Sequence, residues 1–293
     1  MQHQRNPLLG TLAALSVVFV WSIWLVISRA GALTSLTAYD LAALRYGVSA
    51  LFTLPLVVYF KPWRGMSLVR IIVLTTLLGP LYVLMAFGGF KFAPAAHGGI
   101  FMNGALPLMT LAISWLWLAQ RARARHIAAS LIILLGVFLT IGDTNFHFSQ
   151  TWKGDALFVG AAVFFRFYVI VSRLWDVRIL QVLLCSSLLN AFIYVPVWYF
   201  FLPSGMAKTP IEQLWPQILF QGLVPNLFGL LMVSIAARHI GANGTSAFMA
   251  AVPGLVAVLS QTFLGETLGW PSWLGLTVLT GGILMMAGRS RTP

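Results

Sequence analysis

Two arginines stand inside long apolar stretches of the sequence, where a charged side chain is costly. Arg45 lies in the first third of an apolar run at 38–60, and Arg166 lies near the middle of another at 154–174. A guanidinium at the centre of a bilayer costs about 2.5 kcal/mol or more and needs a partner or water. Each arginine is therefore a candidate for binding an anionic group. The alternative is a structural arginine that binds helix carbonyls or reaches outward to the surface.

Four prolines lie near the middle of other apolar runs: Pro80, Pro107, Pro225 and Pro253. A proline inside a helix removes one backbone hydrogen bond and frees the carbonyl four residues earlier. Here those carbonyls belong to Thr76, Asn103, Gln221 and Met249. Three of these residues have polar side chains, and such places must face protein or water rather than lipid. Asn103 and Gln221 are thus candidate cavity residues, unless they cap their own kinks or join neighbouring helices.

The composition identifies these runs as membrane helices. The chain has 293 residues, of which 59% are hydrophobic and 8% are charged. Soluble domains carry about 25% charged residues, which argues against a soluble enzyme, a disordered protein or a secreted disulfide scaffold. The net charge of +12 comes from scattered residues rather than one basic face, so it favours contact with lipid headgroups over nucleic acid. The single cysteine, Cys185, can form neither an internal disulfide nor a metal cluster. We therefore expect no metal and no cofactor.

Ten apolar runs have the length of about 20 residues that crosses the hydrocarbon core. They cover 8–28, 38–60, 68–90, 94–117, 126–142, 154–174, 179–202, 214–236, 243–264 and 270–288. The first run is too long for a cleavable signal peptide and lacks a cleavage motif. The sequence therefore predicts an all-α polytopic membrane protein with ten transmembrane helices, joined by loops too short to hold a soluble domain.

The basic residues predict how these helices are oriented. If the N-terminus is cytoplasmic, twelve Lys and Arg residues lie on the inner side and four on the outer side. The outer four are Arg29, Lys91, Lys153 and Lys208. Because cytoplasmic loops carry the excess of positive charge, we expect both termini in the cytoplasm.

The two halves of the chain, 1–143 and 144–293, match each other in order. The matched pairs include 26–29 with 170–173, Pro80 with Pro225, Pro107 with Pro253, His97 with Asn243, and Gln120 with Glu266. Each half contains five spans, an odd number, so the second half enters the membrane from the opposite side. Such inverted repeats are typical of secondary transporters, which bind substrate near the midplane. The alternative is a duplicated membrane scaffold.

The chain also resembles a known family. The proline in the middle of the fourth span, the Leu-Gly-Glu-Thr-Leu sequence at 264–268 and the glycine-rich last span are similar to the drug/metabolite transporter superfamily, specifically its EamA-type ten-helix exporters. The first half departs from the motif with Ala119-Gln120. The resemblance implies a bacterial inner-membrane exporter, similar in composition to exporters of amino acids, aromatic ones included. Other members carry nucleotide sugars, sugar phosphates or quaternary cations, so the fold leaves the substrate open.

Aromatic residues complete the candidate cavity, because apolar walls with a few polar groups suit an amphipathic organic solute. The candidate cavity residues are Trp21, Ser22, Trp24, Arg45, Tyr46, Tyr82, His97, Asn103, Arg166, Tyr168, Gln221 and Asn243. His97 is a candidate proton carrier because of its residue type, although a satisfied interfacial histidine is the favoured interpretation. The four central prolines are candidate hinges for alternating access. The spans at 126–142 and 270–288 have almost no polar side chains, so we expect them at the periphery.

The carboxylates decide between substrate classes. All six, Asp40, Asp143, Asp155, Asp176, Glu212 and Glu266, lie at or near span ends. Two buried cations and no buried acid favour a zwitterionic or anionic metabolite, a neutral or aromatic amino acid above all, moving down its own gradient. The alternative substrate is an organic cation held by aromatic faces. No catalytic motif is present in the sequence, so we expect the protein not to be an enzyme. We also expect a monomer or weak oligomer whose partners are the small-molecule substrate and the lipid bilayer.

Overall fold

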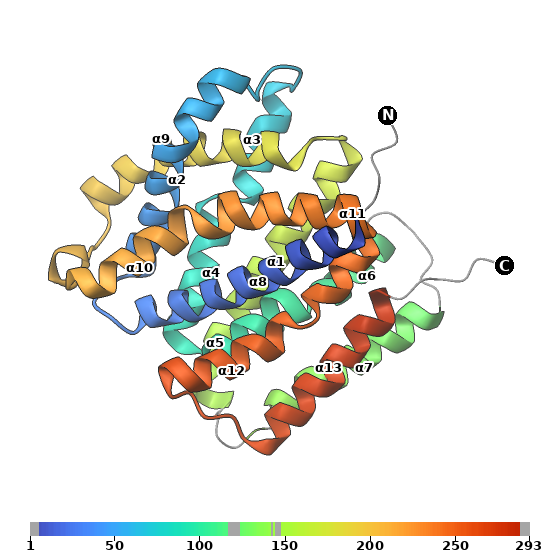
Figure 1. The fold of residues 1–293 in the computed structure, drawn as a ribbon. Helices are drawn as coiled ribbons and strands as arrows, with labels where there is room; N and C mark the ends of the chain where they lie inside the picture. The colour runs from blue at the N-terminus through green and yellow to red at the C-terminus, as the bar shows by residue number, and fades with distance from the viewer. Residues whose placement is uncertain (1–5, 117–123, 142, 144–147, 288–293) are drawn as a thin grey trace.

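The computed structural model describes residues 6–116, 124–141, 143 and 148–287, and every element within them is helical (Figure 1). The helices of the first half are α1 (Pro7–Ala32), α2 (Ala38–Phe60), α3 (Leu68–Leu77), α4 (Pro80–Phe92), α5 (Ala95–Gly98), the π-helix η1 (Gly99–Gly104), α6 (Leu106–Leu116) and α7 (Ala124–Ile141). Those of the second half are α8 (Phe148–Leu174), α9 (Ile179–Phe201), the 3₁₀-helix η2 (Met206–Lys208), α10 (Ile211–Gly222), the π-helix η3 (Val224–Gly229), α11 (Leu230–Met249), α12 (Val252–Leu264) and α13 (Trp270–Ala287).

Eight helical stretches in the described residues are long and apolar enough to cross a membrane. They are Pro7–Ala32, Ala38–Phe60, Leu68–Phe92, Ala124–Ile141, Ser149–Leu174, Leu180–Phe201, Ile211–Gly241 and Ala247–Leu264. The prediction of an all-α membrane protein is confirmed. The other two predicted spans are helical as well: 270–288 contains α13, and 94–117 is divided among α5, η1 and α6.

Polar residues just before the helices set where they begin. Asn6 precedes Pro7, and its side chain accepts a hydrogen bond from the backbone N–H of Leu9. Thr37 and Asp40 form a reciprocal capping box on α2, in which Thr37 Oγ1 accepts from the Asp40 N–H at 3.1 Å. These caps satisfy backbone donors that a helix start otherwise leaves unpaired. They fix the starts of α1 and α2 locally.

The four central prolines stand where helices are interrupted. Pro80 is the first residue of α4 and Pro253 the second of α12, positions at which a missing N–H costs nothing. Pro107 is the second residue of α6, and Pro225 lies within η3. The sequence predicted kinks in continuous helices, whereas the structure has breaks.

Two of the carbonyls expected to be free next to these prolines have local partners. The Thr76 carbonyl accepts from the Gly79 N–H at 3.0 Å. The Gln221 carbonyl accepts from Asn226 Nδ2 at 3.3 Å. Local donors thus replace the helix hydrogen bonds that the prolines remove.

The most extensive helix contacts join the two halves of the chain. α1 lies along α11 and α12, α2 along α9 and α10, and α4 along α8. The pair α7 and α13 lies side by side at one edge of the molecule, which agrees with the expected periphery of these two spans (Figure 1). A Cβ at Gly136 would come within 2.6 Å of the Gly275 carbonyl, so glycine lets these two backbones touch.

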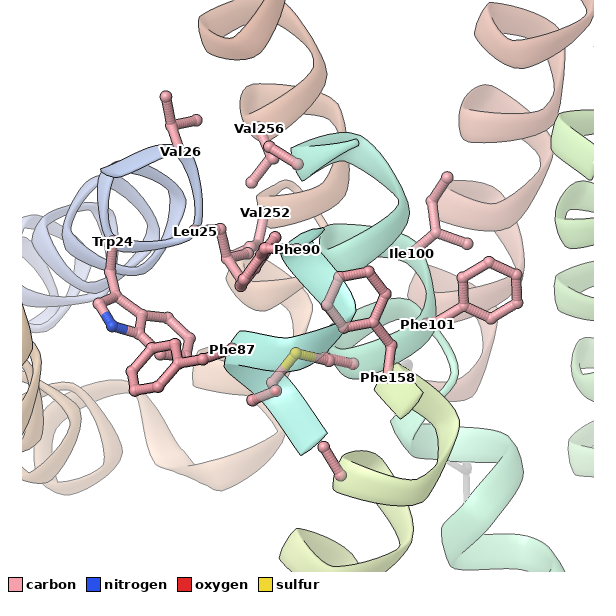
Figure 2. Close-up of a cluster of buried hydrophobic side chains, with 14 of the residues drawn as sticks. Trp24, Leu25, Val26, Phe87, Phe90, Ile100, Phe101, Phe158, Val252 and Val256 are labelled. Carbon is pink, nitrogen blue, oxygen red and sulfur yellow. The ribbon is translucent and has the colours of Figure 1, made fainter. Parts of the chain in front are cut away.

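The core joins α1, α4, η1, α8 and α12 through large apolar side chains (Figure 2). Phe90 and Phe158 meet edge to face with ring centroids 4.8 Å apart, and Phe158 is fully buried. Trp24 and Phe87 form a second edge-to-face pair at 6.3 Å. The indole of Trp24 thus belongs to the packed core while also reaching the cavity described next.

Candidate binding cavity

A cavity of about 210 Å³ lies between the two halves of the chain. Its lining residues are Trp21, Trp24, Arg45, Tyr46, Ser49, Leu78, Tyr82, Met102, Asn103, Leu106, Ala161, Ala162, Phe165, Tyr168, Val169, Leu183, Ser186, Ser187, Pro225, Asn226 and Val233. The lining is mostly apolar and aromatic, with one charged side chain and a few hydroxyls and amides. Such a surface suits an amphipathic organic molecule.

The charged side chain is Arg45, and its guanidinium lies over an aromatic ring. Arg45 Cζ is 5.6 Å from the centroid of the Trp24 ring, within the range of a cation–π contact. Arg45 Nη1 is buried and has no hydrogen-bond partner among the described residues. Among the described residues, no carboxylate lines the cavity. The guanidinium therefore has donor capacity to offer a ligand.

Hydrogen-bonded side-chain amides that lie outside the cavity lining fix the position of the Trp24 indole. Its Nε1 donates to Gln221 Oε1 at 2.8 Å, and Gln221 Nε2 donates to Ser28 Oγ at 3.0 Å and to Gln217 Oε1 at 2.9 Å. Gln217 Nε2 donates in turn to the Ile27 carbonyl at 2.7 Å. Gln221 is fully buried, so it supports the cavity wall from α10 and is not part of that wall.

Further aromatic residues line the cavity. Tyr82 of α4 stacks with Phe165 of α8 at 6.1 Å between centroids, and Phe165 contacts Tyr168 at 5.9 Å. The Tyr46 hydroxyl donates to the Leu78 carbonyl at 3.1 Å, at the break between α3 and α4. These rings make a polarizable surface in the same cavity as the guanidinium.

Two asparagines reach the cavity from the π-helices, Asn103 from η1 and Asn226 from η3. A π-helix shifts the phase of the side chains that follow it and is frequent at functional sites. Asn226 Nδ2 donates to Ser49 Oγ at 2.9 Å. Both helix irregularities therefore bring an amide to the same space.

Seven of the predicted cavity residues line this cavity: Trp21, Trp24, Arg45, Tyr46, Tyr82, Asn103 and Tyr168. The predicted hinge Pro225 lines it as well. The side chains of Pro107 and Asn243 lie outside the described part of the chain. Sequence reasoning missed Ser49 and Asn226, although Ser49 lies one helical turn from Arg45 and Asn226 directly follows Pro225.

Three predicted residues make contacts outside the lining. Ser22 is fully buried and its hydroxyl donates to the Val252 carbonyl at 3.5 Å. Arg166 Nη2 donates to the Leu106 carbonyl at 3.0 Å, as a structural arginine does, while its buried Nε has no partner among the described residues. His97 Nδ1 lies 2.7 Å from Asp155 Oδ1, a contact that fits the favoured interpretation of a satisfied histidine.

One end of the molecule, which we call the acidic end, carries Asp40, Asp143, Asp155 and Glu266. Arg29 Nε lies 2.7 Å from Glu266 Oε1, and Glu266 Oε2 accepts from the Ala95 N–H at 2.9 Å. Asp40 Oδ2 accepts from the Gly205 N–H at 2.9 Å, and Asp143 Oδ2 accepts from the Gly269 N–H at 2.7 Å. These carboxylates thus tie loops and helix ends of the two halves together.

Known proteins share this fold and sequence pattern. Two successive matches to the EamA-like transporter family cover residues 8–142 and 152–288. The chain belongs to this family. The "Uncharacterized transporter YyaM" of Bacillus subtilis (strain 168) is 22% identical over 262 residues, which span 86% of this chain and 85% of that protein. The "Uncharacterized transporter YwfM" of the same organism is 20% identical over 218 residues, 72% of this chain and 70% of its own length.

A solved crystal structure has the same fold. It is 20% identical, its TM-score is 0.65, and the match covers 94% of this chain and 96% of that one. The resemblance to EamA-type proteins is thereby confirmed, and the chain is a multi-pass membrane transporter.

Proposed function

We propose that this transporter exports small metabolites that carry a carboxylate, neutral or aromatic amino acids above all, down their own gradient. The observation that carries the proposal is the buried, unpartnered Nη1 of Arg45 in an aromatic cavity whose lining contains no acid. A carboxylate is the partner that a guanidinium binds most strongly. Trp24, Tyr82 and Tyr168 would contact the apolar part of the solute.

We further propose that the halves 1–143 and 144–293 are inverted repeats of five spans each, ten in all. The helix contacts support this, because a two-fold relation exchanges equivalent pairs. α1 packs on α11 as α8, its counterpart in the second half, packs on α4, and the counterparts α2 and α9 pack on each other, as do α7 and α13. The two successive family matches also support two repeats.

The proposed mechanism is alternating access in the bacterial inner membrane, with both termini in the cytoplasm. In that orientation the acidic end faces outward. The ion pair between Arg29 and Glu266 closes the cavity on that side, and the prolines at the helix breaks allow the half-helices to move. Substrate would enter from the cytoplasm while this end is closed.

Transport by purified protein in liposomes tests the proposal. The solutes are labelled phenylalanine and labelled tetraphenylphosphonium, an organic cation. We expect phenylalanine to move and Arg45→Ala to lower its flux by about tenfold, as expected for the loss of a charge-assisted hydrogen bond. Arg166→Ala is the matched control, because Arg166 is bonded to a carbonyl, and it should lower phenylalanine affinity much less.

Two outcomes would contradict the proposal. Flux of the cation without flux of phenylalanine, unaffected by either arginine substitution, would assign the protein to organic cations. Flux of both solutes equal to that of protein-free liposomes would favour a non-transporting scaffold.

A further inference from the structure

Asn226 has one half of its amide bound by the protein and the other half unbound. It lies in η3 directly after Pro225 and lines the cavity. Its Nδ2 donates to Ser49 Oγ at 2.9 Å and to the Gln221 carbonyl at 3.3 Å. Within the described residues, no protein donor bonds its Oδ1.

The surrounding groups determine which way this amide points. The Ser49 hydroxyl gives its proton to the Gly222 carbonyl at 2.6 Å, so it has only lone pairs to offer Asn226. The Gln221 carbonyl is an acceptor in any orientation. Both neighbours therefore require the NH₂ group, and a flipped amide would set its oxygen against two acceptors. The oxygen is left as an acceptor for something other than the protein.

The position of Asn226 relates it to the proposed carboxylate site. Ser49 follows Arg45 by four residues on α2, so the two lie on one face of that helix, about 6 Å apart along its axis. Both line the cavity. The cavity thus has a strong donor at Arg45 and an oriented neutral acceptor at Asn226, whose amide is bonded to Ser49, one helical turn from Arg45.

We propose that Asn226 is a specificity-determining residue, whose Oδ1 accepts a hydrogen bond from the ammonium group of a zwitterionic substrate while Arg45 binds its carboxylate. This inference rests on the proposed function and narrows its substrate class to amino acids over simple carboxylic acids. A site built to hydrogen-bond a polar group rejects the analogue that lacks this group, because its own polar atom is then left unpaired. A neutral amide also avoids the strong attraction for cations that a carboxylate would create.

Phenylalanine and 3-phenylpropionate test this assignment, because they differ only by the ammonium group. The measurement is kcat/KM for uptake of each solute into proteoliposomes. We expect the unaltered protein to prefer phenylalanine by about tenfold or more. Asn226→Leu, which branches at the same carbon but has no acceptor, should abolish this preference by lowering phenylalanine uptake, with 3-phenylpropionate changed by less than about twofold.

A second variant keeps the test decisive if Asn226→Leu does not fold. Asn226→Asp retains an acceptor and adds charge, so it should keep phenylalanine uptake and raise uptake of phenethylamine, which has the ammonium but no carboxylate. Ser49→Ala, which leaves Oδ1 intact but removes the group that orients the amide, should lower the preference only in part.

The outcomes separate the two proposals. If the unaltered protein moves phenylalanine but both Asn226 variants leave the ratio of the two solutes and the phenethylamine uptake unchanged, the role of Asn226 is wrong and the proposed function stands. Equal losses for phenylalanine and 3-phenylpropionate in a folded Asn226→Leu variant would likewise overturn it. If the unaltered protein moves neither solute, both the proposed function and the role of Asn226 are wrong.

Discussion

Arg29 Nε lies 2.7 Å from Glu266 Oε1 and thereby joins the last turn of α1 to the loop after α12. The same guanidinium donates to the Phe90 carbonyl at the end of α4, and the same carboxylate accepts from the N–H of Ala95 at the start of α5. One ion pair therefore connects four segments from both halves of the chain. Both side chains are largely buried, so the pair is less screened than a surface one.

The pair should contribute measurably to stability. Glu266→Gln removes the charge but keeps the shape, and we expect a loss of about 1.5–3 kcal/mol in the free energy of unfolding, the value of a hydrogen bond to a charged group. Denaturant unfolding in mixed micelles measures it. A double-mutant cycle with Arg29→Gln should give a coupling energy of about 1 kcal/mol or more. Strictly additive losses would show that the contact is not energetically significant.

Arg166 should act on stability rather than on substrate affinity. Because its Nη2 binds the Leu106 carbonyl at the start of α6, Arg166→Ala removes a charged donor from this carbonyl. We expect a loss of about 1–3 kcal/mol in the free energy of unfolding, with KM for phenylalanine nearly unchanged. A rise in KM as large as that of Arg45→Ala, without loss of stability, would place Arg166 at the substrate instead.

Gln221 should be far less replaceable than its exposed neighbour on α10. Gln221→Leu removes the acceptor of the Trp24 indole and the donor to Ser28 and Gln217, and leaving buried polar groups unpaired costs about 1–3 kcal/mol each. Gln213→Leu, at an exposed position, is the matched control and should change stability by less than about 0.5 kcal/mol. Equal effects of the two substitutions would contradict the supporting role of Gln221.

The prolines at the helix breaks should affect rate more than folding. We expect Pro80→Ala and Pro225→Ala to favour a continuous helix and to slow phenylalanine flux by about threefold or more, because the half-helices lose their independent movement. The same experiment applies to Pro107 and Pro253. Pro55→Ala, within α2 and exposed, is the control that should leave flux unchanged. Unchanged flux in all four central variants would remove the hinge role.

The proposed orientation can be tested by cysteine labelling. In a Cys185→Ser background, Lys208→Cys should react with an impermeant maleimide in intact cells, because η2 would face outward. Arg64→Cys, between α2 and α3, should react only after the membrane is permeabilised. Outer labelling of a cysteine at 121–125 or at position 64 would reverse the assigned orientation.

Sequence reasoning located the apolar helices better than the direction of each residue around its helix. Trp21 and Trp24 are three residues apart, close to one turn, and both line the cavity. Ser22 precedes Trp24 by two residues, which is about 200° of rotation, so it faces away and bonds α12. The composition of a span predicts that it crosses the membrane, whereas the face that each residue presents depends on the partner helices.

The residues that the sequence misplaced depend on distant partners. His97 pairs with Asp155, 58 positions away, and the sequence around either residue does not predict this contact. The π-helix η3 changes the phase after Gln221, so that Gln221 supports Trp24 from behind while Asn226 reaches the cavity. Helix irregularities of this kind follow from packing and are not visible in apolar periodicity.

The residues that align with the ion pair between Arg29 and Glu266 in the other repeat do not form a second pair of opposite charges. Arg173, which is exposed, corresponds to Arg29, and Gln120, which lies outside the described residues, corresponds to Glu266. Because a glutamine carries no charge, the two resting conformations of the carrier would differ in free energy. For a passive carrier this makes the half-saturating concentration different on the two faces of the membrane, while the two maximal rates differ in the same proportion. The ion pair thus determines which conformation the empty carrier prefers. Net flux still stops when the substrate concentrations on the two sides of the membrane are equal.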